Sequence, residues 1–533
     1  MGSVDEVELG EEAQLELLQR LAYALVLSGR TEMDLETAEA IVDRCLPSVA
    51  LPGGWDAPTV LRTLLLRSGT VRRPAEGVLD FVHRTFQDYL GARYAVEEGH
   101  LDVLAGHADD TQWEDVIRMA VAHARPRERA ALLRQLLARD VPRLTLLALA
   151  CLEHAAALDA GVRAEVERRA AQLIPPPTTE DAKALAEAGP LVLELLPGPE
   201  GLTRQEALGV TVTASVLGAE EPEGALGVLR RFRGHPDLEV RRQLAGTWSR
   251  FDTTAYASEV LDHLDREKLF VRCESAEQRA ALAGMRPWQG LAFLGAHSAE
   301  QILAAVPEPE ALVYLDLRDN PLLTDLGALP RFGSLRTLLL ARCPEIRDLD
   351  RLAELPLAEF VCGQVADVTG LGSLRSLTRL TVEQELPGES LTDVLPTGAE
   401  LEFLFLGRSS TDRTGLRGLA HWSSLTDLSL GPLTRELSET DWQAVAALPG
   451  LRSLHLNARI LRELPLSVAH MPELSGVGTL RIPGLLGTED LSTLARRLPG
   501  LRTLTLQNMP GHTFPLSRFS GHFPGVDISL VKR

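Results

Sequence analysis

The residues of this chain that could bind metal or form disulfides are widely spaced. The five cysteines are Cys45, Cys151, Cys273, Cys343 and Cys362. None of them forms a Cys-x-x-Cys pair, and no histidine cluster has the spacing of metal ligands. The same scatter argues against a disulfide framework, so we expect no metal and a reducing, cytoplasmic location.

Sequence motifs for nucleophilic and phosphate chemistry are also missing. The chain has no Gly-x-Ser-x-Gly elbow for a hydrolase serine. It has no Gly-x-x-x-x-Gly-Lys-Ser/Thr loop, whose backbone amides and lysine would hold the phosphates of a nucleotide. We therefore predict that this chain is not an enzyme, that it holds no cofactor of its own, and that it works by binding.

The clearest structural signal is a phrase, Leu-x-x-Leu-x-Leu, that returns through the last 220 or so residues. Its copies start 20 to 26 residues apart, at Leu312, Leu335, Leu357, Leu377, Leu401, Leu425, Leu451, Val477, Leu501 and Phe523. This pattern resembles the leucine-rich repeat, in which a short strand is followed by a helix or turn. One repeat cannot close its own core, so ten copies predict an α/β solenoid, or horseshoe, over residues 301–533.

In the leucine-rich repeat family an asparagine, or a cysteine in its place, satisfies buried backbone groups at the bend after each strand. Asn320 and Cys343 occupy that position here, whereas later copies have Ser409, Leu433 and Arg459. Some bacterial proteins of this family are ubiquitin ligases, which use a cysteine nucleophile. Because Cys343 stands at the bend position, we expect it to be structural.

Residues that alternate with the apolar triplet are expected to lie on the concave face and to bind a protein ligand. The predicted binding residues are Tyr314, Asp316, Arg318, Leu339, Arg379, Phe403, Phe405, His455, Asn457 and Arg481. At about 25 cal/mol per Å² of apolar area, covering the two phenylalanines would supply a few kcal/mol of affinity. The alternative is that a neighbouring loop or the helical arm already covers them.

A second signal lies near the N-terminus, in the segment Phe81-Val-His-Arg-Thr-Phe-Gln-Asp-Tyr-Leu-Gly-Ala-Arg-Tyr94. It follows three expected helices, the second capped by Thr31, and a two-stranded wing made by Val71 and Val78–Phe81. The segment resembles the end of the winged-helix part of NACHT/STAND signalling NTPases of actinobacterial type, relatives of NOD-like receptors. That resemblance implies a winged-helix-like unit over residues 1–99, with His83 near the nucleotide as a sensor. The alternative is a partly buried His83 that begins a helix and holds the wing.

Residues 100–300 are expected to form a helical arm. Apolar residues recur there at helical spacing, and Pro175, Pro176 and Pro177 mark a joint because consecutive prolines cannot lie inside a helix. The clearest unit pairs residues 225–232 with residues 238–248, where Asp237 would cap the second helix. This pair resembles a HEAT repeat.

The charge balance is acidic, with 54 basic and 74 acidic residues, a formal net charge of −20 and a pI near 5.2. Such a chain repels nucleic acid unless it has a local basic face, and its arginine pairs are too short to form one. The N-terminus lacks a signal-peptide pattern, and the most apolar run, residues 144–152, is too short to cross a bilayer. We expect neither nucleic acid nor membrane as a partner.

These patterns together favour the ligand-sensing region of a NACHT-type immune signalling NTPase, acting by analogy in antiphage defence. The repeat array would bind a protein ligand and control homo-oligomerisation. An ATPase that uses ATP and magnesium would lie upstream or in a separate protein. The alternative is a stand-alone leucine-rich repeat scaffold or adaptor.

Overall fold

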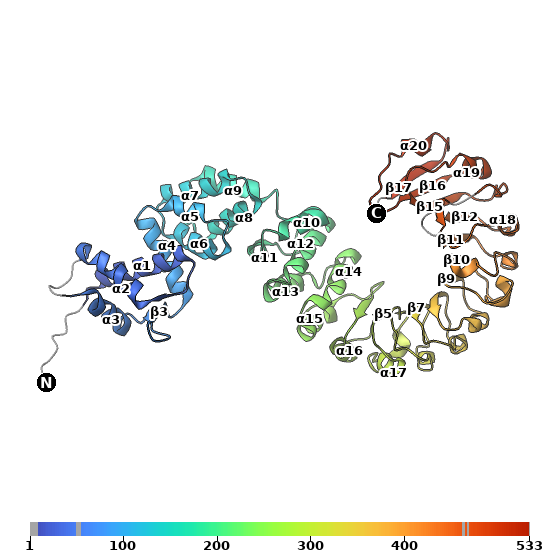
Figure 1. The fold of residues 1–533 in the computed structure, drawn as a ribbon, viewed down its shortest axis with the longest axis horizontal. Coiled ribbons are helices and arrows are strands. Elements are labelled where there is room, and N and C mark those ends of the chain that lie inside the picture. Colours follow the sequence, from blue (N-terminus) through green and yellow to red (C-terminus); the bar gives the residue numbers. More distant parts are fainter. Residues whose placement is uncertain (1–8, 50–54, 461–463, 466–467, 532–533) are drawn as a thin grey trace. The chain divides into compact units, whose positions relative to one another are not determined.

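The computed structural model describes residues 9–49, 55–460, 464–465 and 468–531. The chain divides into two compact units, Met1–Phe232 and Arg233–Arg533. The first unit is helical apart from one small sheet, and the second is built on a 12-stranded sheet (Figure 1).

The N-terminal part of the first unit combines four helices with a three-stranded sheet of order β1-β3-β2. Its elements are α1 (Glu11–Ser28), β1 (Glu32–Asp34), α2 (Leu35–Cys45), α3 (Ala57–Arg67), β2 (Val71–Arg72), β3 (Val78–Phe81) and α4 (Arg84–Glu97). The expected pairing of β2 with β3 is confirmed, and β1 joins it as a third strand. The prediction that Thr31 caps the second helix is wrong. Asp34 caps α2 instead, accepting a hydrogen bond from the Thr37 amide at 2.7 Å, because the residues before it are paired in β1.

The rest of the first unit is helical, as predicted. Its helices are α5 (Leu101–Gly106), α6 (Glu114–His123), α7 (Pro126–Ala138), α8 (Pro142–Cys151), α9 (Ala160–Ala170), α10 (Thr179–Ala186), α11 (Leu191–Leu195), α12 (Arg204–Leu217) and α13 (Pro222–Leu229). The proline joint lies between α9 and α10 and packs against α12. The contact is so close that a Cβ on Gly209 would lie 2.2 Å from the Pro176 carbonyl oxygen.

The second unit begins with short helices, namely α14 (Leu238–Gly246), α15 (Thr253–Glu259), α16 (Ala276–Ala283) and α17 (Ala299–Ala304). Asp237 caps α14 as expected, accepting from the amides of Glu239 and Val240 at 2.9 and 3.2 Å. The two helices predicted as a HEAT-like pair fall on either side of the division between the units, so their pairing stays a prediction.

A parallel sheet of 12 strands dominates the second unit. Its strands are β4 (Val271–Cys273), β5 (Gly290–Phe293), β6 (Tyr314–Asp316), β7 (Thr337–Cys343), β8 (Glu359–Val365), β9 (Arg379–Val382), β10 (Phe403–Arg408), β11 (Asp427–Leu433), β12 (Ser453–Leu456), β15 (Thr479–Leu485), β16 (Thr503–Asn508) and β17 (Asp527–Val531). The ten strands expected from the repeats are confirmed. β4 and β5, which precede residue 301, belong to the same sheet and were not anticipated.

One apolar ladder runs through the core of the repeats. The middle residue of each phrase is in register with that of the next, and each from Leu315 to Leu504 is no more than 1% exposed; they are Leu315, Leu338, Phe360, Leu380, Leu404, Leu428, Leu454, Leu480 and Leu504. The return segments are short turns together with α18 (Glu439–Ala446), α19 (Ser492–Arg497) and α20 (Ser517–Ser520). In Figure 1 the strands line the inner side of the arc and the return segments its outer side. The fold of this unit is therefore the predicted α/β repeat solenoid.

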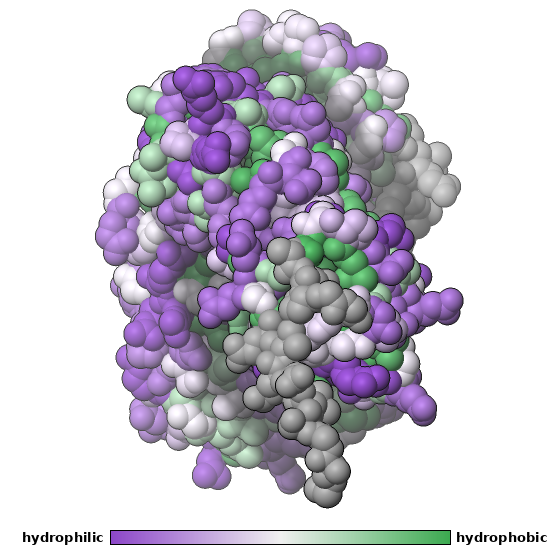
Figure 2. Space-filling model, turned by 90° about the vertical axis from the view of Figure 1, so that its left-hand side faces the viewer, coloured by the Kyte–Doolittle hydropathy of each residue, from purple (hydrophilic) through white to green (hydrophobic). Residues whose placement is uncertain are grey.

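Hydrophilic side chains predominate on the face drawn in Figure 2, where hydrophobic ones form small patches. Among the helices of the described residues, none is long and apolar enough to cross a membrane.

Candidate protein-interaction face

The inner side of the repeat sheet carries side chains in registered rows. The first row, defined by strand pairing, is Tyr314, Thr337, Glu359, Arg379, Phe403, Asp427, Ser453, Thr479 and Thr503. The second row is Asp316, Leu339, Val361, Thr381, Phe405, Ser429, His455, Arg481 and Thr505. Arg318 and Asn457 follow at the strand exits. The structure thus places eight of the ten predicted binding residues in two rows of one sheet and the other two just after their strands.

Phe403 lies in the middle of the first row and is half-buried. The guanidinium of Arg379, its neighbour on β9, lies 4.2 Å from the centre of the Phe403 ring. Arg379 also lies 3.6 Å from the carboxylate of Glu359 on β8. A cation over an aromatic face is attracted by the ring quadrupole, so this stack holds both side chains in place.

Phe405 is also half-buried, and the sheet itself provides its cover. A Cβ added to Gly407 or to Gly431 would lie 2.6 Å from an atom of the Phe405 ring. The ring therefore occupies the space that side chains at these two positions would fill. Both phenylalanines are therefore partly covered by their own sheet, Phe403 by Arg379 and Phe405 by its packing over the two glycines.

Asp316 is only 2% exposed, so it offers little surface to a ligand. Its carboxylate accepts hydrogen bonds from Nε (2.9 Å) and Nη2 (2.6 Å) of Arg318 and from the Arg318 amide (3.0 Å). Its assignment as an accessible binding residue is therefore wrong. Asp316 instead orients Arg318, whose side chain remains 41% exposed on the face.

The C-terminal part of the face is more polar. Burial lowers the pKa of His455, and nearby Arg481 lowers it further, against a smaller opposing effect of Asp427. His455 is therefore largely the neutral imidazole at pH 7. Arg481 is exposed, and Asn457 lies against Gly484, where a Cβ would be 3.0 Å from the asparagine Oδ1.

One residue of the face, Phe270, was missed from the sequence. It is 41% exposed, and its ring stacks on Tyr314 with 5.4 Å between centroids and a tilt of 30°. Gly290 makes this possible, since a Cβ there would lie 2.9 Å from the Phe270 Cβ. The available signal was the neighbouring triplet of Trp288, Leu291 and Phe293, which keeps the spacing of the repeat phrase with only one of its leucines.

The bend residues behave as expected for a structural role. The Asn320 side-chain amide donates to the carbonyls of Phe293 (2.5 Å) and Leu317 (2.9 Å), and its oxygen accepts from the His297 amide at 3.3 Å. The Cys343 thiol donates to the Leu317 carbonyl at 3.2 Å, and burial raises its pKa to about 11. A thiol of that pKa is protonated at neutral pH and is a poor nucleophile. All five cysteines are free and buried.

His83 lies at the start of α4 as its N-cap residue, in keeping with its alternative role, but its side chain is exposed rather than partly buried. Its ring lies 5.9 Å from that of Phe86. No hydrogen bond from its side chain caps the helix. Its assignment as a nucleotide sensor stays a prediction.

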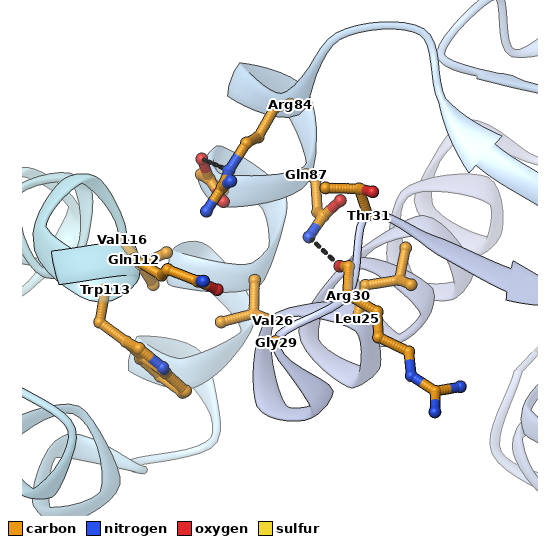
Figure 3. Close-up of a pocket in the computed structure, with 11 residues that line it drawn as sticks. Leu25, Val26, Gly29, Arg30, Thr31, Arg84, Gln87, Gln112, Trp113 and Val116 are labelled. Atoms are coloured by element: carbon orange, nitrogen blue, oxygen red, sulfur yellow. Dashed lines mark hydrogen bonds and ion pairs between the residues drawn. The ribbon is translucent and has the colours of Figure 1, made fainter. Parts of the chain in front are cut away.

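A small cavity lies between α1, α4 and α6, and Arg84, the residue after His83, lines it (Figure 3). Gln87 donates to the Arg30 carbonyl at 3.0 Å, and Arg84 lies 3.5 Å from the buried Asp88 carboxylate, whose pKa is raised by burial. The cavity volume is about 20 Å³, which is room for a single water molecule. This cavity is therefore too small to enclose a nucleotide.

Within the described ranges of the chain, no group of three or more histidine, cysteine, aspartate or glutamate side chains could hold a metal ion. No known protein family model matches this chain, and no curated protein matches it. Solved structures do show similarity. An internalin from Listeria monocytogenes aligns at 16% identity with a TM-score of 0.24, over 47% of this chain and 88% of that chain. A chain of the Drosophila Toll–Spätzle complex, described as a hub in development and innate immunity, aligns at 13% identity with a TM-score of 0.26, over 49% and 39%. A leucine-rich repeat protein from Leptospira interrogans aligns at 14% identity with a TM-score of 0.20, over 52% and 91%.

Proposed function

We propose that the repeat unit is a protein-interaction scaffold and that its concave face binds a protein ligand. The observation that carries this proposal is the pair Phe403 and Phe405, half-buried in the middle of two registered rows and held in place by Arg379 and two glycines. Rigid aromatic side chains and arginine near the centre of a face are typical of residues that dominate binding energy. Because these side chains are already ordered, a partner would lose little conformational entropy in covering them.

The more specific proposal is that the chain is the sensing region of a NACHT-type signalling NTPase that acts in antiphage defence. Support comes from the resemblance of residues 81–94 to that family and from their setting, at the end of β3 and the start of α4, after three helices and a small antiparallel sheet. In this proposal residues 1–99 are a winged-helix-like unit and His83 senses a nucleotide. An upstream or separate ATPase module holds ATP and magnesium, and ligand binding releases the oligomerisation of the receptor.

The second candidate is a stand-alone adaptor that joins two proteins. What favours it is that the repeat unit has a complete core and an ordered face of its own, without any contribution from an ATPase. The two candidates share the concave face and differ in the need for a motor.

A double substitution, Phe403→Ser with Phe405→Ser, tests the concave face. We expect the full chain to keep its melting profile and to capture its partner from its own cells at least roughly tenfold less well, since a few kcal/mol of apolar burial are lost. Leu322→Ser is the matched control, because Leu322 is 59% exposed and lies in the loop after β6. Undiminished capture, or unfolding of the double variant, would contradict the proposal.

The mass of the native protein in its own cells separates the two candidates. An immunoblot with an antibody against the repeat unit should show a band well above 58.0 kDa if a motor is part of the same protein. A phosphate-binding loop in the added part would then support the receptor. A band at 58.0 kDa favours the adaptor or a motor on a separate protein.

A further inference from the structure

Charge is unevenly distributed along the repeat unit. Residues 351–450, which carry β8 to β11, contain 14 acidic residues and 7 arginines, a formal net charge of −7. Residues 451–533 contain 5 acidic and 10 basic residues, a formal net charge of +5. The aromatic pair on β10 therefore lies in the acidic stretch, and a partner docked there meets a negative field.

The acidic residues reach the face beside this pair. Glu359 and Glu383 lie 3.6 and 3.8 Å from the guanidinium groups of Arg379 and Arg408. Asp427 is the registered neighbour of Phe403 on β11, and its carboxylate accepts a hydrogen bond from the Thr426 hydroxyl at 2.8 Å. Glu383 also interacts with Arg342, which is itself paired with Asp319. The carboxylates of Glu359, Glu383, Asp427 and Asp319 thus outnumber the three guanidinium groups near the aromatic pair by one.

The second row supplies the apolar surface next to these charges. Leu339, Val361 and Phe405 occupy this row on β7, β8 and β10, and all three are half-buried. Arg379 on Phe403 shows that a cation packs on a ring of this face. In the part of the chain that the structure describes, no cationic side chain makes such a contact with Phe405.

We propose that this part of the face binds a basic segment of a partner protein. A lysine or arginine of that segment packs its stem on Phe405 and directs its charge toward Asp427 and Glu383, and an adjacent apolar side chain packs on Leu339 and Val361. Neighbouring strands lie about 4.8 Å apart, so a lysine or arginine packed on Phe405 can reach the carboxylates of Asp427 and Glu383. The inference rests on the proposed protein-binding function and adds the chemistry of the partner.

Two libraries of displayed peptides test the inference on the full chain. One library fixes a lysine or arginine beside an apolar residue, and the other fixes an aspartate or glutamate there. We expect enrichment from the basic library, and we expect the selected peptides to bind Asp427→Lys and Glu383→Lys at least roughly tenfold more weakly. Glu400→Lys is the matched control, because it makes the same charge change at an exposed residue that precedes β10, and it should leave binding unchanged.

The outcomes separate this inference from the proposed function. Peptides from the acidic library that lose binding on Phe403→Ser with Phe405→Ser would overturn the basic partner and leave the concave face as the binding site. Basic peptides that bind Asp427→Lys and Glu400→Lys equally would overturn the inference in the same way. Peptides insensitive to the double phenylalanine substitution, or no enrichment from either library, would count against the concave face itself.

Discussion

Replacing Asn320 with alanine should destabilise the repeat unit at β5 and β6. The asparagine side chain is fully buried, and besides a long contact of 3.4 Å to the Arg318 carbonyl it makes three hydrogen bonds, two to the carbonyls of Phe293 and Leu317 and one from the His297 amide. Alanine leaves these three backbone groups without that partner. Because they lie at the bend between neighbouring repeats, the loss weakens the stacking of one repeat on the next.

The expected magnitude follows from the hydrogen bonds. A neutral hydrogen bond contributes about 1 kcal/mol net, so three of them sum to about 3 kcal/mol. A Cys343→Ala variant loses one bond from a weak thiol donor, which we expect to cost under about 1 kcal/mol. The two substitutions stand at equivalent bends, so the comparison isolates the asparagine hydrogen bonds.

Hydrogen exchange measured by mass spectrometry is the suitable assay, because it reports opening of each segment in a chain with two units. Amides of β5 and β6 in Asn320→Ala should exchange about a hundredfold faster than in the parent, as 1.4 kcal/mol corresponds to a factor of ten. Those of β7 in Cys343→Ala should change by less than about tenfold. Equal effects of the two substitutions would refute the reasoning.

Two further predictions concern glycine contacts and acid stability. Gly209→Ala should destabilise the first unit by about 2 kcal/mol, because its Cβ collides with the Pro176 carbonyl, whereas Gly227→Ala, with nothing within 4 Å, should stabilise it by up to about 1 kcal/mol. Thermal unfolding followed by circular dichroism checks both, and equal melting temperatures would contradict the argument. Burial alone would raise the pKa of Asp441, but hydrogen bonds from Leu416, Ser438 and Arg435 bring it below its ordinary value. The stability it contributes is therefore present above the unfolded pKa of about 4 and is lost as pH falls through the lower folded pKa. Asp441→Asn should thus cost about 2 kcal/mol at pH 7 and progressively less as pH falls through the folded pKa in urea titrations, and a cost that does not vary with pH would contradict it.

The repeat unit was predictable from the sequence because a repeated spacing of apolar residues identifies it. The phrase Leu-x-x-Leu-x-Leu directs its apolar side chains to the core, away from the concave face, and the middle residues from Leu315 to Leu504 are buried as that spacing requires. Of the two strands before the array, β5 was missed because Trp288 and Phe293 replace leucines, although the spacing of the phrase is kept. At β4 the first position of the phrase is Lys268, so the apolar spacing itself is incomplete there.

Details of the face depended on contacts that spacing does not encode. Alternation correctly placed Asp316 on the inner face, but it did not indicate that Arg318 folds back over its carboxylate. Support of Phe405 by Gly431 joins residues 26 positions apart on different strands, and it could be recognised only once the register of β10 and β11 was known. Such pairings appear in the structure and not in the repeat pattern.

The strand exits show that stacking, rather than local preference, sets the backbone there. Asp319, Arg342, Gln364 and Arg408 hold one equivalent position in four repeats with φ between 53° and 63°, where Gly484 stands in a fifth. A sparsely populated backbone conformation of this kind costs a residue other than glycine about 1–3 kcal/mol. The exposed ion pair of Arg342 with Asp319 returns at most about 1 kcal/mol. The ion pair does not offset the free-energy cost of the backbone conformation, so the pairing of the strands must impose the turn. Arg408→Gly should therefore stabilise the repeat array. The same substitution would remove the ion-pair partner of Glu383 from the proposed binding face.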